Sequence, residues 1–422
     1  MITQPLRRQP GRGPDTRRGA APIASERVTG EPVPFAAPGF SLEAGQAVRR
    51  IPAAGWPDDG TGVVEFEREF AAYVQAPHAV AMGHGIDAIE WSLRALRLPP
   101  RSRVLLPAMA PCDVAWAVLR AGLSPTLADV DPATAMPSPA TVGRAVRGYG
   151  RPAAMVALHY AGTIAPVAEL AEAAGLPLHR VVEDAAHALG AYADGRPVGA
   201  GSQAACFSFH ATMNLPVGQG GMVTTGDERL AEWIRHARPY RSHAASRRLP
   251  GHGGARRAEE AAHSACMTDA QAAVGRAQLP HLRARQRRRE VIAARYTAAL
   301  HRLRGLECPA PPRNGCHAWH LYVLRVLEEF GTERDDMVAL LAERGIGTAV
   351  HFTPLHHMAR FRQTVQPPPD GLPGADSVSR QVLSLPMYPT LPETSVDRVC
   401  TEITRLAGRV GSRRRTPLRP SP

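Results

Sequence analysis

The sequence has 422 residues, of which 44% are hydrophobic, and a formal net charge of +12 at neutral pH. This length allows two domains of ordinary size around a large buried core. No apolar run approaches the roughly 20 residues that a membrane-spanning helix needs, and the polar amino-terminal residues lack the apolar core of a secretory signal. The composition therefore excludes an integral membrane protein and predicts a cytoplasmic location.

All 50 basic residues are arginine, so the sequence contains no lysine. Much of the positive charge lies at the two ends, in Arg-, Pro- and Gly-rich stretches that predict disordered tails over residues 1–34 and 409–422. Between them we expect a large domain over residues 35–300 and a smaller carboxyl-terminal domain over residues 301–408. No aromatic platform or DNA-reading motif accompanies the charge, so nucleic-acid binding is not expected.

The first half of the chain alternates between helical and strand-like patterns. Apolar residues recur at helical spacing in residues 63–74, 86–96, 114–121 and 167–174. Short, nearly continuous apolar runs predict buried strands over residues 104–107, 125–130, 153–158, 180–185, 204–209 and 221–225. This alternation predicts an α/β domain with a mostly parallel sheet that is covered on both faces.

The second half opens with a long, Arg-rich helical stretch over residues 269–304, which we expect to connect the two domains. A smaller α+β unit follows, with predicted strands over 320–326 and 348–352 and predicted helices over 335–344 and 395–407. The Pro- and Gly-rich residues 366–374 predict a loop.

Metal ligation has little support in the sequence. The six cysteines are scattered without C-x-x-C spacing, which is typical of buried thiols and not of disulfides or a zinc site. The segment HFTPLHH contains His351, His356 and His357, but adjacent histidines on a regular element rarely bind one ion, and no cysteine or acid is nearby in the sequence. We therefore predict no metal site.

Several motifs follow one another in a distinctive order. They are VPFAAPGF, GHGIDA (Gly83–Ala88), VVEDAAHALGA (Val181–Ala191), CFSFHATMNLPVGQGGMV (Cys206–Val223), MTDAQAAVGRAQL (Met267–Leu279) and VLSLPMYPTL (Val382–Leu391). With these motifs the chain resembles the DegT/StrS-type sugar aminotransferases of pyridoxal phosphate (PLP) fold type I. The resemblance covers about Val33–Ala407 and implies a large PLP-transferase-like domain with a smaller carboxyl-terminal α+β domain.

Gly85 and Ile86 lie where the family has its phosphate loop. Backbone N–H groups at the start of a helix favour an anion, and glycine permits its close approach. By the resemblance, Gly85 and Ile86 contribute to cofactor binding, although the family normally has a threonine in place of Ile86. On the tripeptide alone, an ordinary turn before a helix is the competing interpretation.

Three further cofactor-binding positions follow from the resemblance. Asp184 would pair with the pyridinium nitrogen of the cofactor, His187 would lie near its phenolic oxygen, and Ser208 would bind its phosphate. Taken alone, Asp184 is better explained as a helix cap, and Ser208 is equally explained as a small residue in a packed sheet.

Met213 is the main departure from the family pattern. The family reads T-K-N where this chain reads Thr212-Met213-Asn214, and the lysine forms the internal Schiff base and transfers the substrate proton. A thioether has no titratable proton and cannot form an imine. We therefore assign no catalytic residue, and we expect PLP or pyridoxamine phosphate (PMP), if bound at all, to be held non-covalently.

Two other positions also depart from the family pattern. Pro111 lies where a flat side chain usually stacks on the cofactor ring. Ser264 lies near the place of an asparagine that reaches the phosphate in the neighbouring subunit of a dimer.

Three hypotheses about function remain open. The chain is a degenerate, regulatory or partner subunit in sugar or secondary-metabolite biosynthesis, where it binds a nucleotide sugar or aminocyclitol without turnover. Alternatively, it is an enzyme of altered chemistry that uses histidines with non-covalent PLP or PMP. In the third hypothesis, the chain does not form a homodimer but is the accessory half of a heterodimer with a lysine-bearing paralogue.

Overall fold

The computed structural model describes residues 31–50, 60–238, 264–312, 315–365 and 367–413, with side chains described as far as residue 407. Most of the two predicted tails lies outside these ranges. Residues from Pro32 onward belong to one compact unit. Among the described residues, no helix combines the length and the apolar character that crossing a membrane requires.

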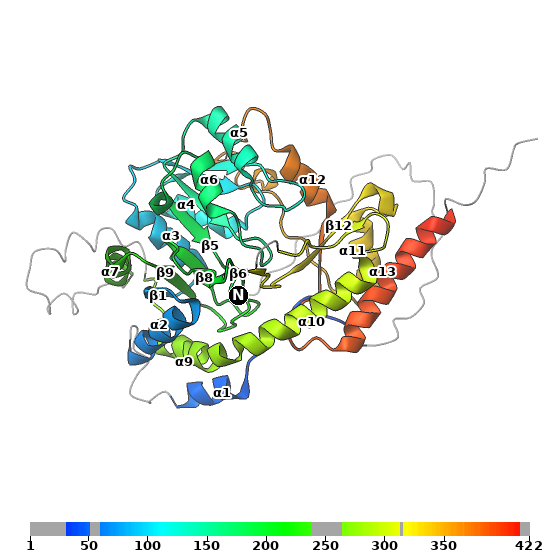
Figure 1. Cartoon of the computed structure of the whole chain (residues 1–422), viewed down its shortest axis with the longest axis horizontal. Helices are drawn as coiled ribbons and strands as arrows, with labels where there is room; N and C mark the ends of the chain where they lie inside the picture. Colours follow the sequence, from blue (N-terminus) through cyan, green and yellow to red (C-terminus); the bar gives the residue numbers. More distant parts are fainter. Residues whose placement is uncertain (1–30, 51–59, 239–263, 313–314, 366, 414–422) are drawn as a thin grey trace, which may run out of the picture. The chain divides into compact units, whose positions relative to one another are not determined.

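The centre of the molecule is a seven-stranded sheet with the order β1-β9-β8-β5-β4-β2-β3 (Figure 1). Its strands are β1 (His78–Met82), β2 (Arg103–Pro107), β3 (Ser124–Ala128), β4 (Ala154–Leu158), β5 (Val181–Asp184), β8 (Ala205–Ser208) and β9 (Gly221–Thr225). Neighbouring strands from β3 to β8 are parallel, whereas β9 is antiparallel to both of its neighbours. The predicted α/β fold with a mostly parallel sheet is confirmed.

Both faces of the sheet are covered by helices, as the apolar strands predict. Alternate residues of β1 enter different hydrophobic clusters, Val80 and Met82 on one face and Ala79 and Ala81 on the other. The covering helices are α2 (Thr61–Val74), α3 (Gly85–Ala95), α4 (Cys112–Arg120), α5 (Pro139–Tyr149), α6 (Val167–Ala173) and α7 (Glu228–Ala237). The loops at the carboxyl ends of the parallel strands are thereby held on a rigid scaffold.

The predicted helical stretch over residues 269–304 is two helices, α9 (Asp269–Gln278) and α10 (Leu282–Leu300), joined by a 3-10 turn over Leu279–His281. Pro280 lies in that turn, and proline lacks the N–H that a continuous helix requires. Both α9 and α10 run along the lower side of the view in Figure 1, from the large sheet to the smaller one.

A smaller antiparallel sheet has the order β10-β12-β13 and its own hydrophobic cluster. Its elements are β10 (Leu306–Glu307), β12 (Tyr322–Val326), β13 (Val382–Leu385), α11 (Arg334–Glu343) and α13 (Glu393–Arg413). The strand predicted over residues 348–352 is wrong, because only Ala349 bridges to Ser384 before the chain leaves the sheet.

Helix α12 (Pro373–Gln381) begins within the segment that was predicted to be a loop. Proline is favoured at the first position of a helix, and Asp129 accepts hydrogen bonds from the N–H groups of Gly374 and Ala375 at 2.9 and 2.8 Å. The cap comes from a residue far away in the sequence, so the local pattern does not reveal it.

The sequence patterns also missed α1 (Leu42–Arg49) and a small sheet of β6 (Tyr192–Ala193), β7 (Arg196–Pro197) and β11 (Gly315–Cys316). Upstream of α1, Val33 forms a parallel bridge with Ile346 of the smaller sheet region.

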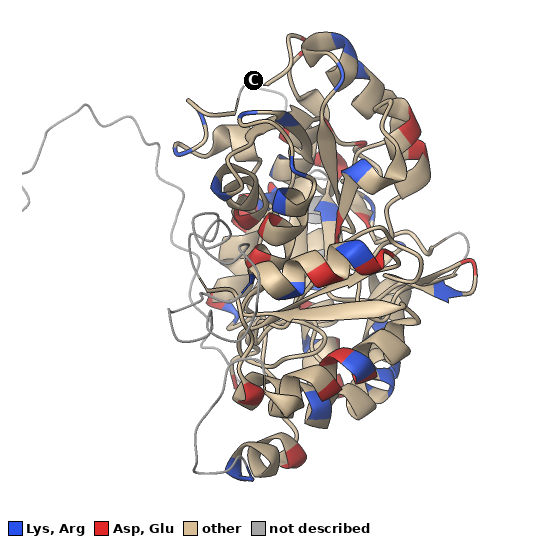
Figure 2. Cartoon of the chain, turned by 90° about the vertical axis from the view of Figure 1, so that its left-hand side faces the viewer, with Lys and Arg blue, Asp and Glu red and all other residues tan. Residues whose placement is uncertain are grey.

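Basic and acidic residues alternate along the helices that face the viewer in Figure 2.

Candidate active site

The candidate site lies at the carboxyl ends of the parallel strands, where α/β proteins bind ligands. Strand β5 ends at Asp184 and the neighbouring strand β8 ends at Ser208. Gly85, the first residue of α3, packs directly on Ser208, since a Cβ atom on Gly85 would lie 2.7 Å from the Ser208 Cβ. The structure thus brings Gly85 and Ser208 together, as the family motif implies.

The first turn of α3 is capped by the chain itself. His84 is the N-cap residue, and its Nδ1 accepts a hydrogen bond from the N–H of Ile86 at 3.2 Å. Ser208 Oγ accepts a weak one from the N–H of His210 at 3.4 Å. An anion that bound this helix start through the Ile86 N–H would first have to displace the His84 ring.

Asp184 is 3% exposed, and its Oδ1 accepts a hydrogen bond from the N–H of Ala186 at 3.0 Å. Burial raises the pKa of its carboxyl group to about 6, because the charged form loses its hydration. A cationic group beside Asp184 would therefore stabilise its ionised carboxylate.

His159, which also lies at the carboxyl ends of the strands, has its tautomer fixed by its partners. Its Nδ1 accepts a hydrogen bond from the N–H of Ala165 at 3.0 Å, so the proton is on Nε2, which donates to Glu183 at 3.0 Å. Its backbone N–H donates to the carbonyl of Asp184, which helps to fix the end of β5.

His187 lies in a stack of rings that the sequence did not reveal. Its ring centroid is 4.3 Å from that of His320 and 5.8 Å from that of Phe352, with interplanar angles of 27° and 21°. Burial lowers the pKa of His187 to about 3 and that of His351 to about 4. These imidazoles are therefore neutral at physiological pH, and His187 Nδ1 is buried without a hydrogen-bond partner in the described part of the chain.

Asn214 anchors the loop that follows β8. Its amide donates to the carbonyls of Leu189 and Ala318 at 3.1 and 3.0 Å, which leaves its oxygen to accept from His320 Nδ1 at 3.2 Å. These contacts also fix the position of the preceding residue, Met213.

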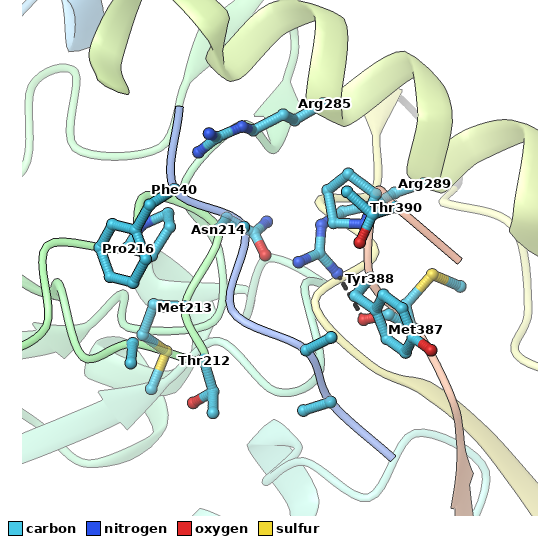
Figure 3. A pocket seen from close by; sticks show the side chains of 15 residues that line it. Phe40, Thr212, Met213, Asn214, Pro216, Arg285, Arg289, Met387, Tyr388 and Thr390 are labelled. Atoms are coloured by element: carbon cyan, nitrogen blue, oxygen red, sulfur yellow. Dashed lines mark hydrogen bonds between the residues drawn. The ribbon is translucent and has the colours of Figure 1, made fainter. Parts of the chain in front are cut away.

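Met213 lines a pocket with an empty volume of about 540 Å³ (Figure 3). Its other walls come from four segments of the chain: residues 36, 37, 39 and 40; residues 211, 212, 214 and 216; Arg285 and Arg289 of α10; and residues 387–390. The walls are largely apolar, with Phe40, Pro216, Met387 and Tyr388 among them.

Arg285 and Arg289 bring positive charge to this pocket. Arg289 is 4% exposed and donates from Nη1 to the carbonyls of Trp319 and Met387, both at 3.0 Å, and burial lowers its pKa to about 9. Arg285 donates to Gln278 at 2.6 Å, while its Nη1 is buried without a partner among the described residues. No carboxylate in the described ranges pairs with either guanidinium, so an anionic ligand group would offset their charge.

Three other sequence-derived positions do not line the pocket beside Met213. Pro111 is the N-cap residue of α4 and is half-buried, and Ser264 is exposed. His351 contacts Ser384 Oγ through Nδ1 at 2.8 Å, away from His356 and His357. Those two histidines meet Asp376, so the absence of a nearby acid in the sequence does not hold in space.

The residues present fit one end of a pyridoxal cofactor better than the other. Asp184 is a buried acid suited to a pyridinium nitrogen, and His187 offers an unpartnered ring nitrogen close by. At the phosphate end, the side chain at position 86 is apolar and its N–H is capped by His84. No lysine side chain is available to form a Schiff base, because the sequence contains no lysine.

A mostly parallel sheet that carries these groups at its strand ends is the architecture of the PLP fold type I aminotransferases. The model of the DegT/DnrJ/EryC1/StrS aminotransferase family matches residues 41–404, and the chain belongs to this family. It is 37% identical over 372 residues to the spore coat polysaccharide biosynthesis protein SpsC of Bacillus subtilis (strain 168), with 87% of this chain and 95% of that protein covered.

Two solved structures support the same assignment. The S. venezuelae DesV structure, in complex with a ketimine intermediate, has a TM-score of 0.78 and 33% identity, covering 90% of this chain and 99% of DesV. DesI, solved in the presence of its TDP-sugar product, has a TM-score of 0.80 and 29% identity, covering 92% of this chain and 96% of DesI.

Proposed function

We propose that this chain is a sugar aminotransferase homologue that does not transaminate by itself and acts as a degenerate, regulatory or partner subunit in sugar or secondary-metabolite biosynthesis. The observation that carries the proposal is the absence of lysine from the whole sequence. By the resemblance, Met213 occupies the position of the family's catalytic lysine. Bound PLP supplies an electron-withdrawing ring that stabilises negative charge on the substrate carbon, but the family reaction also needs an amine that moves the proton.

Neither Met213 nor the histidines of the candidate site supply this function well. Met213 offers a thioether, which is a weak hydrogen-bond acceptor and carries no proton. His210 Nδ1 is already 3.0 Å from the Thr212 hydroxyl. The lowered pKa values of His187 and His351, about 3 and 4, make these imidazoles weak bases at neutral pH, which argues against the enzyme of altered chemistry.

The same pocket is suited to holding an anionic ligand. Arg285 and Arg289 provide the positive charge, while Phe40 and Tyr388 provide apolar surface for a ring. We infer that the ligand is a nucleotide-linked sugar or an aminocyclitol derivative, in line with the TDP-sugar named for DesI. PLP or PMP, when present, would be held non-covalently through Asp184, His187, Ser208 and the start of α3 at Gly85.

The first experiment asks whether the wild-type chain forms a covalent link with PLP. After incubation with PLP, borohydride reduction and peptide mass spectrometry, we expect no pyridoxyl group on any internal residue. The amino-terminal amine can still react, and its adduct serves as the internal positive control. A borohydride-stable adduct inside the chain, or steady amino-group transfer from an amino acid to a keto sugar by the purified protein, would contradict the proposal.

A gain-of-amine variant tests the site itself. We expect Met213→Lys to acquire a visible absorbance with PLP and a reducible adduct at position 213, because the new amine enters the pocket. Gln219→Lys is the matched control, since Gln219 is exposed nearby and does not line the pocket. Equal labelling at both positions would show that PLP reacts with any exposed amine and has no site here.

The heterodimer hypothesis has its own measurement. When the chain is expressed alone, we expect the purified protein to contain this polypeptide and no second kind of subunit. Co-expression with a lysine-bearing paralogue distinguishes the cases, because a partner subunit would co-purify in a fixed ratio and restore amino transfer. A regulatory or degenerate homologue would do neither.

A further inference from the structure

Three potential metal ligands meet between the 3-10 turn η5 (Leu355–His357) and helix α12. Nε2 of His356 and Nε2 of His357 lie 2.8 and 2.9 Å from the same atom, Oδ1 of Asp376. The ligand atoms of the three residues all lie within 4.8 Å of one another. Two imidazoles and a carboxylate are a common ligand set for zinc in proteins.

The two adjacent histidines converge although both lie in the short turn. The turn ends at His357, and the chain becomes extended at Met358. The two ring centroids are 4.3 Å apart with an interplanar angle of 59°. Their Nε2 atoms meet at one oxygen of Asp376, which the spacing in the sequence did not predict.

Both histidines contact the same carboxylate oxygen. Each ring carries its proton on Nε2, so both N–H groups converge on Oδ1 of Asp376. In a tetrahedral zinc site with bonds of about 2.1 Å, neighbouring ligand atoms are about 3.4 Å apart. The observed 2.8 and 2.9 Å contacts would therefore have to open by only about 0.5 Å.

The surrounding charges also favour a cation. Asp376 carries one negative charge, and Asp129 is close enough to act electrostatically on His356. Arg144, 3.7 Å from Asp129, offsets part of this second charge. Asp129 also binds the first N–H groups of α12, so it stabilises the helix that presents Asp376.

We propose that His356, His357 and Asp376 bind one divalent transition-metal ion of the zinc class, with water completing its coordination. The side chains of His357 and Asp376 are 44% and 36% exposed, which gives the ion access from solvent. Because the ligands come from η5 and α12, the ion would cross-link the two ends of the segment 358–375. This site is separate from the pocket beside Met213 and does not depend on the proposed function.

Zinc titration of the full-length protein tests the proposal directly. The protein is treated with a chelator, carries Cys316→Ser to remove an exposed thiol, and is titrated with Zn²⁺ in a calorimeter. We expect one equivalent to bind, with His357→Ala and Asp376→Asn each weakening that step at least about tenfold. Co²⁺ in place of zinc should give the visible spectrum of a tetrahedral site containing nitrogen ligands.

The control is His236→Ala, which removes another exposed histidine that contacts its own helix through the Glu232 carbonyl. Its zinc affinity should equal that of the parent protein. The same affinity in Asp376→Asn as in His236→Ala would overturn the proposal. Thermal melts give a second readout, because zinc should raise the melting temperature of the parent but not of Asp376→Asn.

Discussion

The buried carboxyl group of Asp184 lowers the free energy of unfolding by an amount that depends on pH. Its pKa is raised from 3.8 to about 6 by burial, so the folded state binds more protons than the unfolded state between these values. The free energy of unfolding therefore falls as the pH rises through this window. The full effect is about 3 kcal/mol, and it is present above pH 6.

We expect Asp184→Asn to be more stable than the parent at pH 8, by an amount that approaches this value, and nearly equal to it at pH 4. The amide keeps the shape and the hydrogen bond to the Ala186 N–H but never ionises. Urea unfolding at the two pH values measures the difference. A gain in stability that is the same at both pH values would show that ionisation of Asp184 is not the cause.

Among single residues, the sequence motifs predicted part of the candidate site and missed the rest. Gly85 and Ser208 do meet, because both lie at the carboxyl edge of the sheet. The sequence gives no local signal for His320 and Phe352, which stack with His187. It gives none for Arg285 either, because α10 contains many arginines. Their roles come from packing between distant segments, which spacing in the sequence does not encode.

The contact between α3 and β8 positions the candidate phosphate end of the site. Gly85 permits this contact because any side chain there would overlap Ser208. We expect Gly85→Ala to lower the free energy of unfolding by roughly 1–3 kcal/mol, since the helix start must move away from the strand. It should also weaken any PLP binding.

Gly45→Ala is the matched control for this substitution. Gly45 lies in α1, and a Cβ atom there would meet nothing within 4 Å. Alanine should be neutral or stabilising by up to about 1 kcal/mol, because it favours the helix. Thermal unfolding of both variants provides the measurement, and equal destabilisation would exclude a steric origin for the Gly85 effect.

The strands and helices that were predicted in the first half lie close to their predicted positions, because the buried strands are continuous apolar runs, but β1, α5 and α7 were not predicted. Errors arose where a distant group decided the local structure. Helix α12 depends on its cap from Asp129, and the strand predicted over residues 348–352 loses its partner after Ala349. A local pattern contains neither contact.

For the molecule as a whole, buried neutral histidines make stability sensitive to acid. The pKa values of His187, His317 and His351 are lowered from 6.5 to about 3, 4 and 4 by burial. The unfolded chain therefore binds more protons at low pH, and stability that is complete above pH 6.5 is lost as the pH falls towards these values. Each histidine accounts for about 2 kcal/mol at pH 5.

We expect the urea midpoint to fall clearly between pH 7.5 and pH 5, since three histidines outweigh the opposite effect of Asp184. His351→Asn should reduce this fall, because it removes one buried imidazole. His179→Gln, which changes an exposed histidine, should leave the fall in the urea midpoint unchanged. A midpoint that does not change between these pH values would rule out the buried histidines as the cause.

The bridge at Val33 has a consequence for how ligand binding and folding are connected. Val33 donates its N–H to the Gly345 carbonyl and accepts from the N–H of Gly347, both at 2.8 Å, and the residues that follow it form one wall of the pocket. Local opening near residue 346 would release that wall. By thermodynamic reciprocity, a molecule bound beside Met213 should slow amide hydrogen exchange at Gly347, which does not line the pocket.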